Sequence, residues 1–533
     1  MNDKRMSYIL ITTLFFTTHS YAALPPETIN PDINGGKILI YSTDGEYIDS
    51  ANVGNLPDMV TFTPDGKRIL SANEGEPSTD YKIDPKGSIS IIHLTGKKVQ
   101  RVKTLSFDDI PLPADIRIKP GANPANDLEP EYITINKAGT KAWVSLQENN
   151  AFAIIDLVQE RIESVVSLGI KDFDSIDINT QDGANVAPAP ANIFGLFQPD
   201  TISSYTLNGK DYVVTANEGE YRDFGDYVDY AKGSLLLKKG AKFSRQLQDD
   251  ILNIQGRREL HVLKDLGMDA DGTYTSLYLA GTRSFSIRDS NGKLIYDSGA
   301  DFEQKLALQY PQNFNTRVAK TDNKKKIKKL QKHSSPYETI GETAFFWEGV
   351  DARSHKKGCE PEALALAEIG NRVFAYIGLE KQGGFFIYEI SDPQNPTMVD
   401  YQNDIDYTVS PISSGDLEPE GMVTFSQDSN HYLAIANELS STVSIYQLDK
   451  NGKAKQLASL QTGTFAGGAA EIIAYDPGTK KLFVSNGESK TVDTIDVSNP
   501  AKPTKSTVID FSAHGSSLQS VAVKNGLVAI AVE

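Results

Sequence analysis

The phrase Ala72-Asn73-Glu74-Gly75-Glu76 returns as Ala216-Asn217-Glu218-Gly219-Glu220, and weaker echoes of it recur along the chain. Each copy ends the same kind of unit. A Pro-acid pair opens one strand, a polar turn follows, and a second strand runs to an acidic end, as in Asp58–Glu74 and Glu131–Glu148. Short-strand repeats spaced roughly 40 to 70 residues apart are typical of a β-propeller.

Strand-turn-strand hairpins with period-two alternation are predicted along the whole sequence. They span residues 58–74, 131–148, 200–218, 273–283, 362–380, 420–438 and 471–488. A last hairpin, Ser520–Glu533, has no third strand after it, and the early strand Gly36–Asp44 has no hairpin before it. Joined, these two segments complete a blade and leave no open sheet edge. We therefore predict an all-β, single-domain propeller of seven or eight blades over residues 23–533, with its ring closed by the N- and C-terminal strands.

The composition bounds the partners and the location of the protein. The net charge of −17 disfavours nucleic acid and anionic membranes and favours cations, although solubility alone also explains it. Residues 1–22 look like a secretory signal, with basic residues first, an apolar stretch and the cleavage site Ser20-Tyr21-Ala22. No later segment reaches about 18 apolar residues, so no membrane span is expected in the mature chain. Cys359 is the only cysteine of the sequence, so no internal disulfide is possible. From the signal-like residues 1–22 we predict export to the periplasm or the exterior.

Acidic residues occupy equivalent ends of the predicted strands. An antiparallel hairpin places the start of its first strand beside the end of its second, and the inner strands of a propeller open on one channel mouth. The sequence therefore predicts a ring of carboxylates around that mouth. Its members are Asp58, Glu74, Glu131, Glu148, Asp200, Glu218, Glu362, Glu380, Glu420 and Glu438.

Such a ring cannot stay ionised without partners, because like charges a few ångström apart raise one another's pKa values or attract cations. Oxygen ligands without histidine or cysteine suit Ca²⁺, or Mg²⁺, better than zinc. Two interpretations stay open. Either the ring binds Ca²⁺, or its members cap strand ends by hydrogen bonds to backbone amides and hold the blades in register.

One arginine interrupts the acidic pattern. Arg283 stands where the unit of residues 362–380 has Glu380, and it is expected to face the ring. It either neutralises charge or holds a phosphate or carboxylate beside a metal, as in phosphoryl transfer. Arg222 and Arg353 are expected on face loops at the same mouth.

Two stretches break the repeat. Residues 165–197 contain four aspartates and are predicted to form a long face loop. Residues 316–346 contain five lysines between 324 and 329, and are predicted to form a solvated, disordered loop. The alternative for this basic run is contact with a phosphate or polyanion.

Five segments resemble the choice-of-anchor I family, namely residues 56–81, 197–220, 280–303, 360–384 and 415–425. The resemblance implies a secreted bacterial β-propeller, and some family members carry an alkaline-phosphatase label. In the family, segments similar to residues 467–500 and 520–533 precede the stretch that corresponds to 36–45. The chain therefore looks circularly permuted, with no sorting anchor expected after the last blade.

Two functional hypotheses follow. In the first, the ring holds a divalent metal and hydrolyses a small anionic or phosphorylated substrate, with Glu131, Glu362, Glu420 and Arg283 as catalytic residues. In the second, the protein is a non-catalytic, calcium-stabilised scaffold at the cell surface or in the periplasm, with an unknown surface ligand. The label of the relatives is an analogy at the level of the fold, which does not decide between the two.

Overall fold

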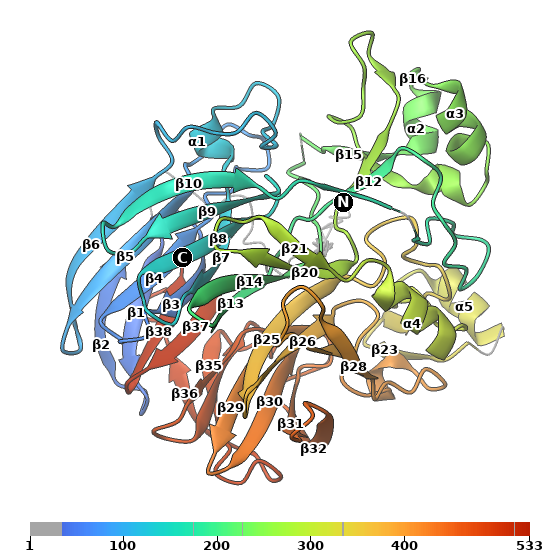
Figure 1. Ribbon diagram of the computed structural model, residues 1–533. Helices are drawn as coiled ribbons and strands as arrows, with labels where there is room; N and C mark the ends of the chain where they lie inside the picture. The colour runs from blue at the N-terminus through green and yellow to red at the C-terminus, as the bar shows by residue number, and fades with distance from the viewer. Residues whose placement is uncertain (1–34, 174, 226, 333–334, 516) are drawn as a thin grey trace, which may run out of the picture.

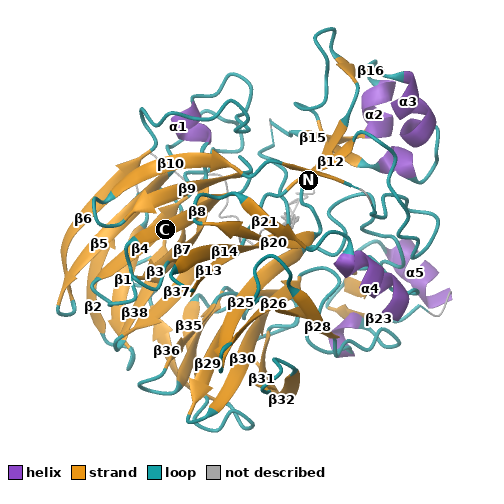
Figure 2. Ribbon diagram, in the orientation of Figure 1, coloured by secondary structure: helices purple, strands orange, loops and turns teal. Residues whose placement is uncertain are grey.

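The computed structural model describes residues 35–533 except 174, 226, 333–334 and 516. The described chain is an all-β, propeller-like protein. Seven four-stranded sheets make up most of it, and the helices lie at the periphery (Figure 2). The predicted signal segment, residues 1–22, lies outside the described residues.

The first three sheets after the N-terminal strands follow chain order. Their strands are β3 (Pro57–Phe62), β4 (Arg68–Asn73), β5 (Ser88–Thr95) and β6 (Lys98–Ser106); β7 (Pro130–Ile135), β8 (Lys141–Leu146), β9 (Ala151–Asp156) and β10 (Arg161–Ser167); and β13 (Ile202–Leu207), β14 (Lys210–Asn217), β20 (Ser284–Asp289) and β21 (Leu294–Asp297).

Three further sheets are built of consecutive strands. They are β25 (Pro361–Ile369), β26 (Arg372–Leu379), β27 (Phe385–Glu389) and β28 (Thr397–Gln402); β29 (Pro419–Gln427), β30 (Asn430–Asn437), β31 (Thr442–Leu448) and β32 (Ala454–Gln461); and β33 (Ile473–Asp476), β34 (Lys481–Asn486), β35 (Thr491–Asp496) and β36 (Thr504–Asp510).

The seventh sheet joins the two ends of the described chain. It has the order β2-β1-β38-β37 and consists of β1 (Lys37–Ser42), β2 (Tyr47–Asn52), β37 (Leu518–Lys524) and β38 (Leu527–Val532). β1 pairs antiparallel with β38 along its whole length, and Figure 1 shows the blue and red strands side by side. The prediction that the first and last strands share a sheet is confirmed.

The inner strands of neighbouring sheets contact one another in sequence, from β3 to β7, β13, β25, β29, β33, β37 and back to β3. The hydrophobic core lies between the sheets. Leu70 and Ile89 of one sheet pack with Val144 and Ile155 of the next, and all four are fully buried. Burial of each such side chain contributes about 1.5–3 kcal/mol.

Residues 273–283 do not form a blade hairpin, so that prediction is wrong. They lie in a long insertion between β14 and β20, and β19 (Leu277–Leu279) pairs in parallel with β12 (Ile193–Leu196). The rest of the insertion and its surroundings comprise β11 (Ile170–Asp172), β15 (Tyr230–Lys232), α2 (Gly233–Lys238), β16 (Lys242–Phe243), α3 (Arg245–Leu247), η1 (Gln248–Leu252), η2 (Arg257–Glu259), β17 (His261–Leu263) and β18 (Thr273–Tyr274).

Residues 316–346 are also not the disordered loop that was predicted. They contain β22 (Val318–Thr321), α5 (Lys324–Lys332), β23 (Tyr337–Ile340) and β24 (Thr343–Trp347). Ile327 and Leu330 are three residues apart, so a helix places both on one face, where they are partly buried. The lysines between 324 and 329 lie on the exposed remainder of the helix. The remaining helices are α1 (Pro124–Asp127), α4 (Asp301–Gln309) and η3 (Pro411–Ser413). Within the described residues, no helix is long and apolar enough to cross a membrane.

Candidate functional site: a ring of buried carboxylates

The Pro-acid pairs form irregularities at the starts of inner strands. In β3, Pro57 pairs with Asn73 and Met59 with Ala72, so Asp58 is the extra residue of a bulge. Similar register shifts place Glu131 in β7, Glu362 in β25 and Glu420 in β29. A bulge redirects a side chain away from the regular alternation, and it is common beside functional sites. The repeated local sequence thus places one acid in an irregularity at the start of each of these four inner strands.

The asparagine and glutamate of the repeated phrase have different roles. Asn73 donates from Nδ2 to Ser88 Oγ and Ser90 Oγ, and so ties β4 to β5. Asn217 bonds Ser284 Oγ and Ser286 Oγ in the equivalent way. These amides join neighbouring strands of one sheet through serine hydroxyls, and not through the backbone amides that the second interpretation expected. The glutamates that follow them, in contrast, face other carboxylates.

The predicted ring members come together in overlapping groups. In each group, one oxygen from each side chain lies within 4.8 Å of the others. The groups are Glu74, Glu131 and Glu148; Asp200, Glu218 and Glu362; Glu218, Glu360 and Glu380; and Glu362, Glu380 and Glu420. The two remaining predicted members belong to none of these groups: Asp58 is the bulge residue of β3, and Glu438 directly follows β30.

We call Glu74, Glu131 and Glu148 the open cluster. All three are at most 4% exposed. Among the described residues, neither carboxylate oxygen of Glu131 has a hydrogen-bond partner, and the same holds for Oε2 of Glu74. Burial, and then the neighbouring carboxylates, raise the pKa values of Glu74 and Glu131 well above the usual range. A buried, ionised carboxylate in this setting is costly unless a cation or proton joins it.

We call Glu218, Glu360 and Glu380 the lysine-paired cluster, because the chain supplies its cations. Lys357, 1% exposed, places Nζ 2.5 Å from Glu218 Oε1 and 3.3 Å from Glu360 Oε2. Burial lowers the pKa of Lys357, but Glu218 and Glu220 more than offset that effect, and the pKa is raised. Arg353 pairs with Glu360 and Lys381 with Glu380.

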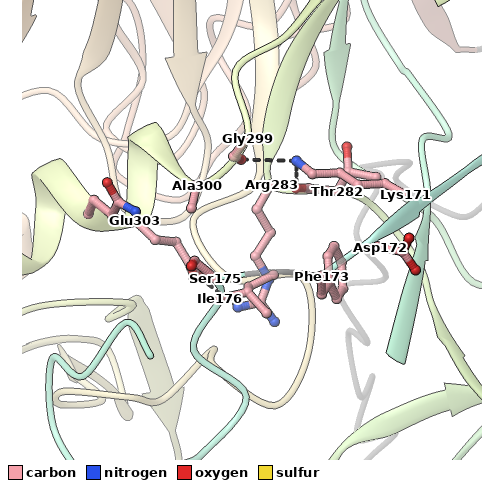
Figure 3. Close-up of a pocket in the computed structure, with 11 residues that line it drawn as sticks. Lys171, Asp172, Phe173, Ser175, Ile176, Thr282, Arg283, Gly299, Ala300 and Glu303 are labelled. Atoms are coloured by element: carbon pink, nitrogen blue, oxygen red, sulfur yellow. Dashed lines mark hydrogen bonds and ion pairs between the residues drawn. The ribbon is translucent and has the colours of Figure 1, made fainter. Parts of the chain in front are cut away.

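Arg283 lies in a different environment from the one that the sequence predicted. Its guanidinium donates to Glu303 Oε1 at 2.6 Å and to the backbone carbonyls of Asp177, Ser354 and Lys356. The side chain lines a cavity of about 240 Å³ beside α4, and Figure 3 shows it extending next to Glu303. The guanidinium is thus already held by a carboxylate and three carbonyls outside the ring groups.

Several charged residues of the site escaped the sequence prediction. Glu129 is 1% exposed, and its pKa is raised by burial and by Glu148. Glu360 is fully buried, and Glu418 lies 3.6 Å from Lys381. A signal for all three was present, because each precedes a Pro-acid pair and forms a Glu-Pro-Glu triplet with it.

The predicted arginines Arg222 and Arg353 do lie at the ring. Arg222 is fully buried, 3.1 Å from Asp127 and 3.9 Å from Glu129. Arg353 reaches the lysine-paired cluster through Glu360. Lys357 itself has no repeat signature, because it comes from the segment between β24 and β25 rather than from a blade.

The donor set of the open cluster fits a hard divalent cation. Ca²⁺ takes oxygen ligands at about 2.3–2.6 Å, so two oxygens on one ion lie at most about 5 Å apart. The 4.8 Å limit for Glu74, Glu131 and Glu148 agrees with that span. No histidine or cysteine belongs to the groups named above, which favours Ca²⁺ or Mg²⁺ over zinc.

Comparison with known proteins identifies relatives along part of the chain. Gigasin-3a of Magallana gigas is 34% identical over 134 residues, which are 25% of this chain and 39% of that protein. The mesenchyme-specific cell surface glycoprotein of Strongylocentrotus purpuratus is 24% identical over 299 residues, 51% of this chain and 36% of that protein. The chain thus spans less than two fifths of the length of each relative.

Solved structures with a similar arrangement are distant in sequence. The periplasmic gluconolactonase PpgL of Pseudomonas aeruginosa has a TM-score of 0.44 at 11% identity, and covers 93% of this chain and 99% of its own. The β-propeller domain of Cps50 (Swd1) from Myceliophteria thermophila has a TM-score of 0.37 at 7% identity, and covers 90% of this chain and 97% of its own.

A protein-family model described as the choice-of-anchor I domain matches residues 18–393. Four of the five segments that carried the resemblance lie within this match, and residues 415–425 lie beyond it. The match spans well over half of the sequence, and the chain belongs to the choice-of-anchor I domain family.

Proposed function

We propose that this protein is an exported, calcium-binding β-propeller whose carboxylate ring binds Ca²⁺ and stabilises a non-catalytic binding scaffold. The observation that carries the proposal is Glu131. It is buried, it lies within 4.8 Å of Glu74 and Glu148, and both its oxygens lack a hydrogen-bond partner among the described residues. Mg²⁺ is the alternative ion for the same oxygens.

The seven sheets are proposed to be the blades of one closed ring, which forms a single domain. Two observations support this: the cyclic series of contacts between inner strands, and the pairing of β1 with β38. A closed ring directs every Pro-acid bulge to one central mouth. Membership of the choice-of-anchor I family supports a surface or secreted location, and one relative is named as a cell surface glycoprotein.

A scaffold is favoured over a phosphoesterase because of where Arg283 lies. The catalytic hypothesis needs this guanidinium free to hold a phosphate beside the metal. Its four hydrogen bonds within the described chain go instead to Glu303 and to backbone carbonyls. Glu362 and Glu420, the other proposed catalytic acids, group with Glu380, which is already paired with Lys381.

The test compares Ca²⁺ binding and thermal stability for wild type, Glu131→Gln and Glu368→Gln. Glu368 is a matched control because it lies on the exposed side of inner strand β25. We expect Ca²⁺ to raise the melting temperature of wild type and of Glu368→Gln. Glu131→Gln should lose most of that gain, yet be at least as stable as wild type after chelation, since the amide removes a like charge.

Hydrolysis of an aryl phosphate, with Ca²⁺ and after chelation, separates the two functional classes. The scaffold proposal expects no turnover in either condition. Chelation-sensitive turnover that is lost in Glu131→Gln, while the protein stays folded, would overturn it. Equal stability of wild type with and without Ca²⁺ would reject the calcium site.

A further inference from the structure

A second acidic cluster lies outside the ring, where two loops meet. Asp177 and Asp182 belong to the loop between β11 and β12, and Asp351 belongs to the segment between β24 and β25. One carboxylate oxygen from each lies within 4.8 Å of the other two. The cluster therefore joins segments about 170 residues apart in the sequence.

Asp177 is held in place on several sides. Its backbone N–H donates to Glu303 Oε2 at 2.8 Å, and its carbonyl accepts from Arg283 at 2.6 Å. Its carboxylate accepts from Ser354 Oγ at 2.6 Å and from the N–H of Asn179 at 2.9 Å. These bonds fix the position of the carboxylate and leave lone pairs available on both oxygens.

Asp351 is the residue that points to a ligand. It is 2% exposed, and its Oδ2 accepts from the N–H of Gly183 at 2.7 Å. Its other oxygen, Oδ1, has no hydrogen-bond partner within the part of the chain that the structure describes. A buried carboxylate with an unpartnered oxygen, in a group with two further carboxylates, is costly unless a positive charge or a proton joins it.

The nearest arginine does not neutralise the cluster. Arg283 is committed to Glu303, which is itself an acid next to Asp177. Burial and then Glu303 raise the pKa of Asp177 to about 8, and burial raises that of Asp351. Asp182, in contrast, is exposed and gives an ion a route in from the solvent.

We infer that Asp177, Asp182 and Asp351 bind a second divalent cation of the Ca²⁺ class, which ties the loop before β12 to the segment before β25. Three carboxylates supply the protein ligands, and water completes the coordination of six to eight oxygens. The site uses none of the ring residues, so it stands or fails independently of the proposed function.

Hydrogen exchange of the loop peptide over residues 175–190, with and without Ca²⁺, is the direct test. We expect Ca²⁺ to slow exchange at least ten-fold in wild type, because the ion holds the loop closed. Asp351→Asn and Asp182→Asn should abolish that slowing and lower the number of bound Ca²⁺ ions by one. Asp182 is exposed, so its substitution is expected to leave the fold intact and keeps the test valid if Asp351→Asn misfolds.

Two controls separate this site from the ring. Asp271→Asn removes a carboxylate from an exposed turn and should behave as wild type. Glu131→Gln should lose binding at the ring and keep the Ca²⁺-dependent protection of the loop. Protection that does not depend on Ca²⁺ in wild type, or that survives in Asp182→Asn, would overturn the inference and leave a proton shared between the buried aspartates.

Discussion

The open cluster and the lysine-paired cluster have nearly the same geometry and opposite charge balance. Each brings one oxygen from each of three carboxylates within 4.8 Å of the others, and all six residues are at most 4% exposed. The lysine-paired cluster has Lys357 at its centre, with Arg353 and Lys381 beside it. In the open cluster, the two oxygens of Glu131 have no hydrogen-bond partner within the described chain.

The difference indicates how a ring of repeated acids remains folded. Five of the seven sheets carry a Pro-acid pair at or just before the start of the inner strand, so the repeat itself concentrates negative charge. Where an inserted segment reaches the ring, as the one carrying Lys357 does, the chain neutralises that charge. On the side of the open cluster, the insertion between β14 and β20 brings Arg222 to Asp127 and Glu129, but both oxygens of Glu131 lack a hydrogen-bond partner among the described residues, so we expect a divalent cation from solution to complete the neutralisation there.

Removal of Lys357 should have the largest effect on stability. Lys357→Met leaves Glu218 and Glu360 with an uncompensated buried charge, and we expect a loss of about 3–5 kcal/mol in the free energy of unfolding. Urea denaturation in saturating Ca²⁺ measures this loss. A loss below about 1 kcal/mol would mean that Arg353 and Lys381 suffice, and the contrast between the clusters would disappear.

Chelation should have the next largest effect, and it should act through the open cluster. At a free Ca²⁺ concentration about 100 times the dissociation constant, a site bound only in the folded state contributes about 2.7 kcal/mol. We expect EDTA to remove an amount of this order from wild type, and less from Glu131→Gln. An equal loss in both proteins would place the stabilising ion elsewhere.

The pH dependence of the metal-free protein should have a definite sign. The folded-state pKa values of Glu74 and Glu131 are raised above the usual value of about 4.3. The folded state therefore holds more protons than the unfolded state, and the stability present below about pH 4.3 is lost as the pH rises through the raised folded-state pKa values. Each excess proton contributes about 1.4 kcal/mol per pH unit.

Urea denaturation between pH 5 and 8, with wild type and Glu131→Gln in parallel, isolates this effect from other titrating groups. Wild type should fall more steeply with pH than the variant when metal is absent, and Ca²⁺ should flatten the slope of wild type. Parallel slopes for the two proteins without metal would contradict the charge imbalance assigned to the open cluster.

The smallest effect should come from removal of Lys381, the partly exposed lysine beside the lysine-paired cluster. The side chain of Lys381 is 13% exposed, and it contacts Glu380 and Glu418. Lys381→Met is expected to cost about 1–2 kcal/mol, less than Lys357→Met, because water reaches the carboxylates in its place. Thermal denaturation of the two variants side by side measures the order, and a reversed order would reject Lys357 as the central counter-charge.

Much of the fold could be predicted from the sequence, because the repeat encodes it locally. Seven of the eight hairpins predicted from alternation, turns and Pro-acid pairs are the inner hairpins of the seven sheets, and the unpaired ends predicted that β1 joins β38. Residues 273–283 misled the prediction since they have strand-like alternation inside a long insertion. The pairing of β19 with β12 depends on tertiary packing that no local pattern reveals.

The residues of the site could be predicted only where they lie at or next to the ends of the repeated strands. Eight of the ten predicted acids belong to groups of close carboxylates, because each lies at or next to the end of a repeated strand. Lys357 and the surroundings of Arg283 come from insertions, whose path is set by tertiary contacts. The circular permutation of the segments remains a prediction. The most useful signal that was overlooked is the Glu-Pro-Glu triplet, which marks Glu129, Glu360 and Glu418.

Calorimetric titration of the metal-free protein with Ca²⁺, on wild type, Glu131→Gln and Glu380→Gln, tests the central claim most directly. Glu380 is the matched residue of the lysine-paired cluster. We predict that wild type and Glu380→Gln bind Ca²⁺ with the same stoichiometry, and that Glu131→Gln binds one ion fewer. Unchanged binding in Glu131→Gln would contradict the account and leave the carboxylate ring a purely structural, proton-sharing feature.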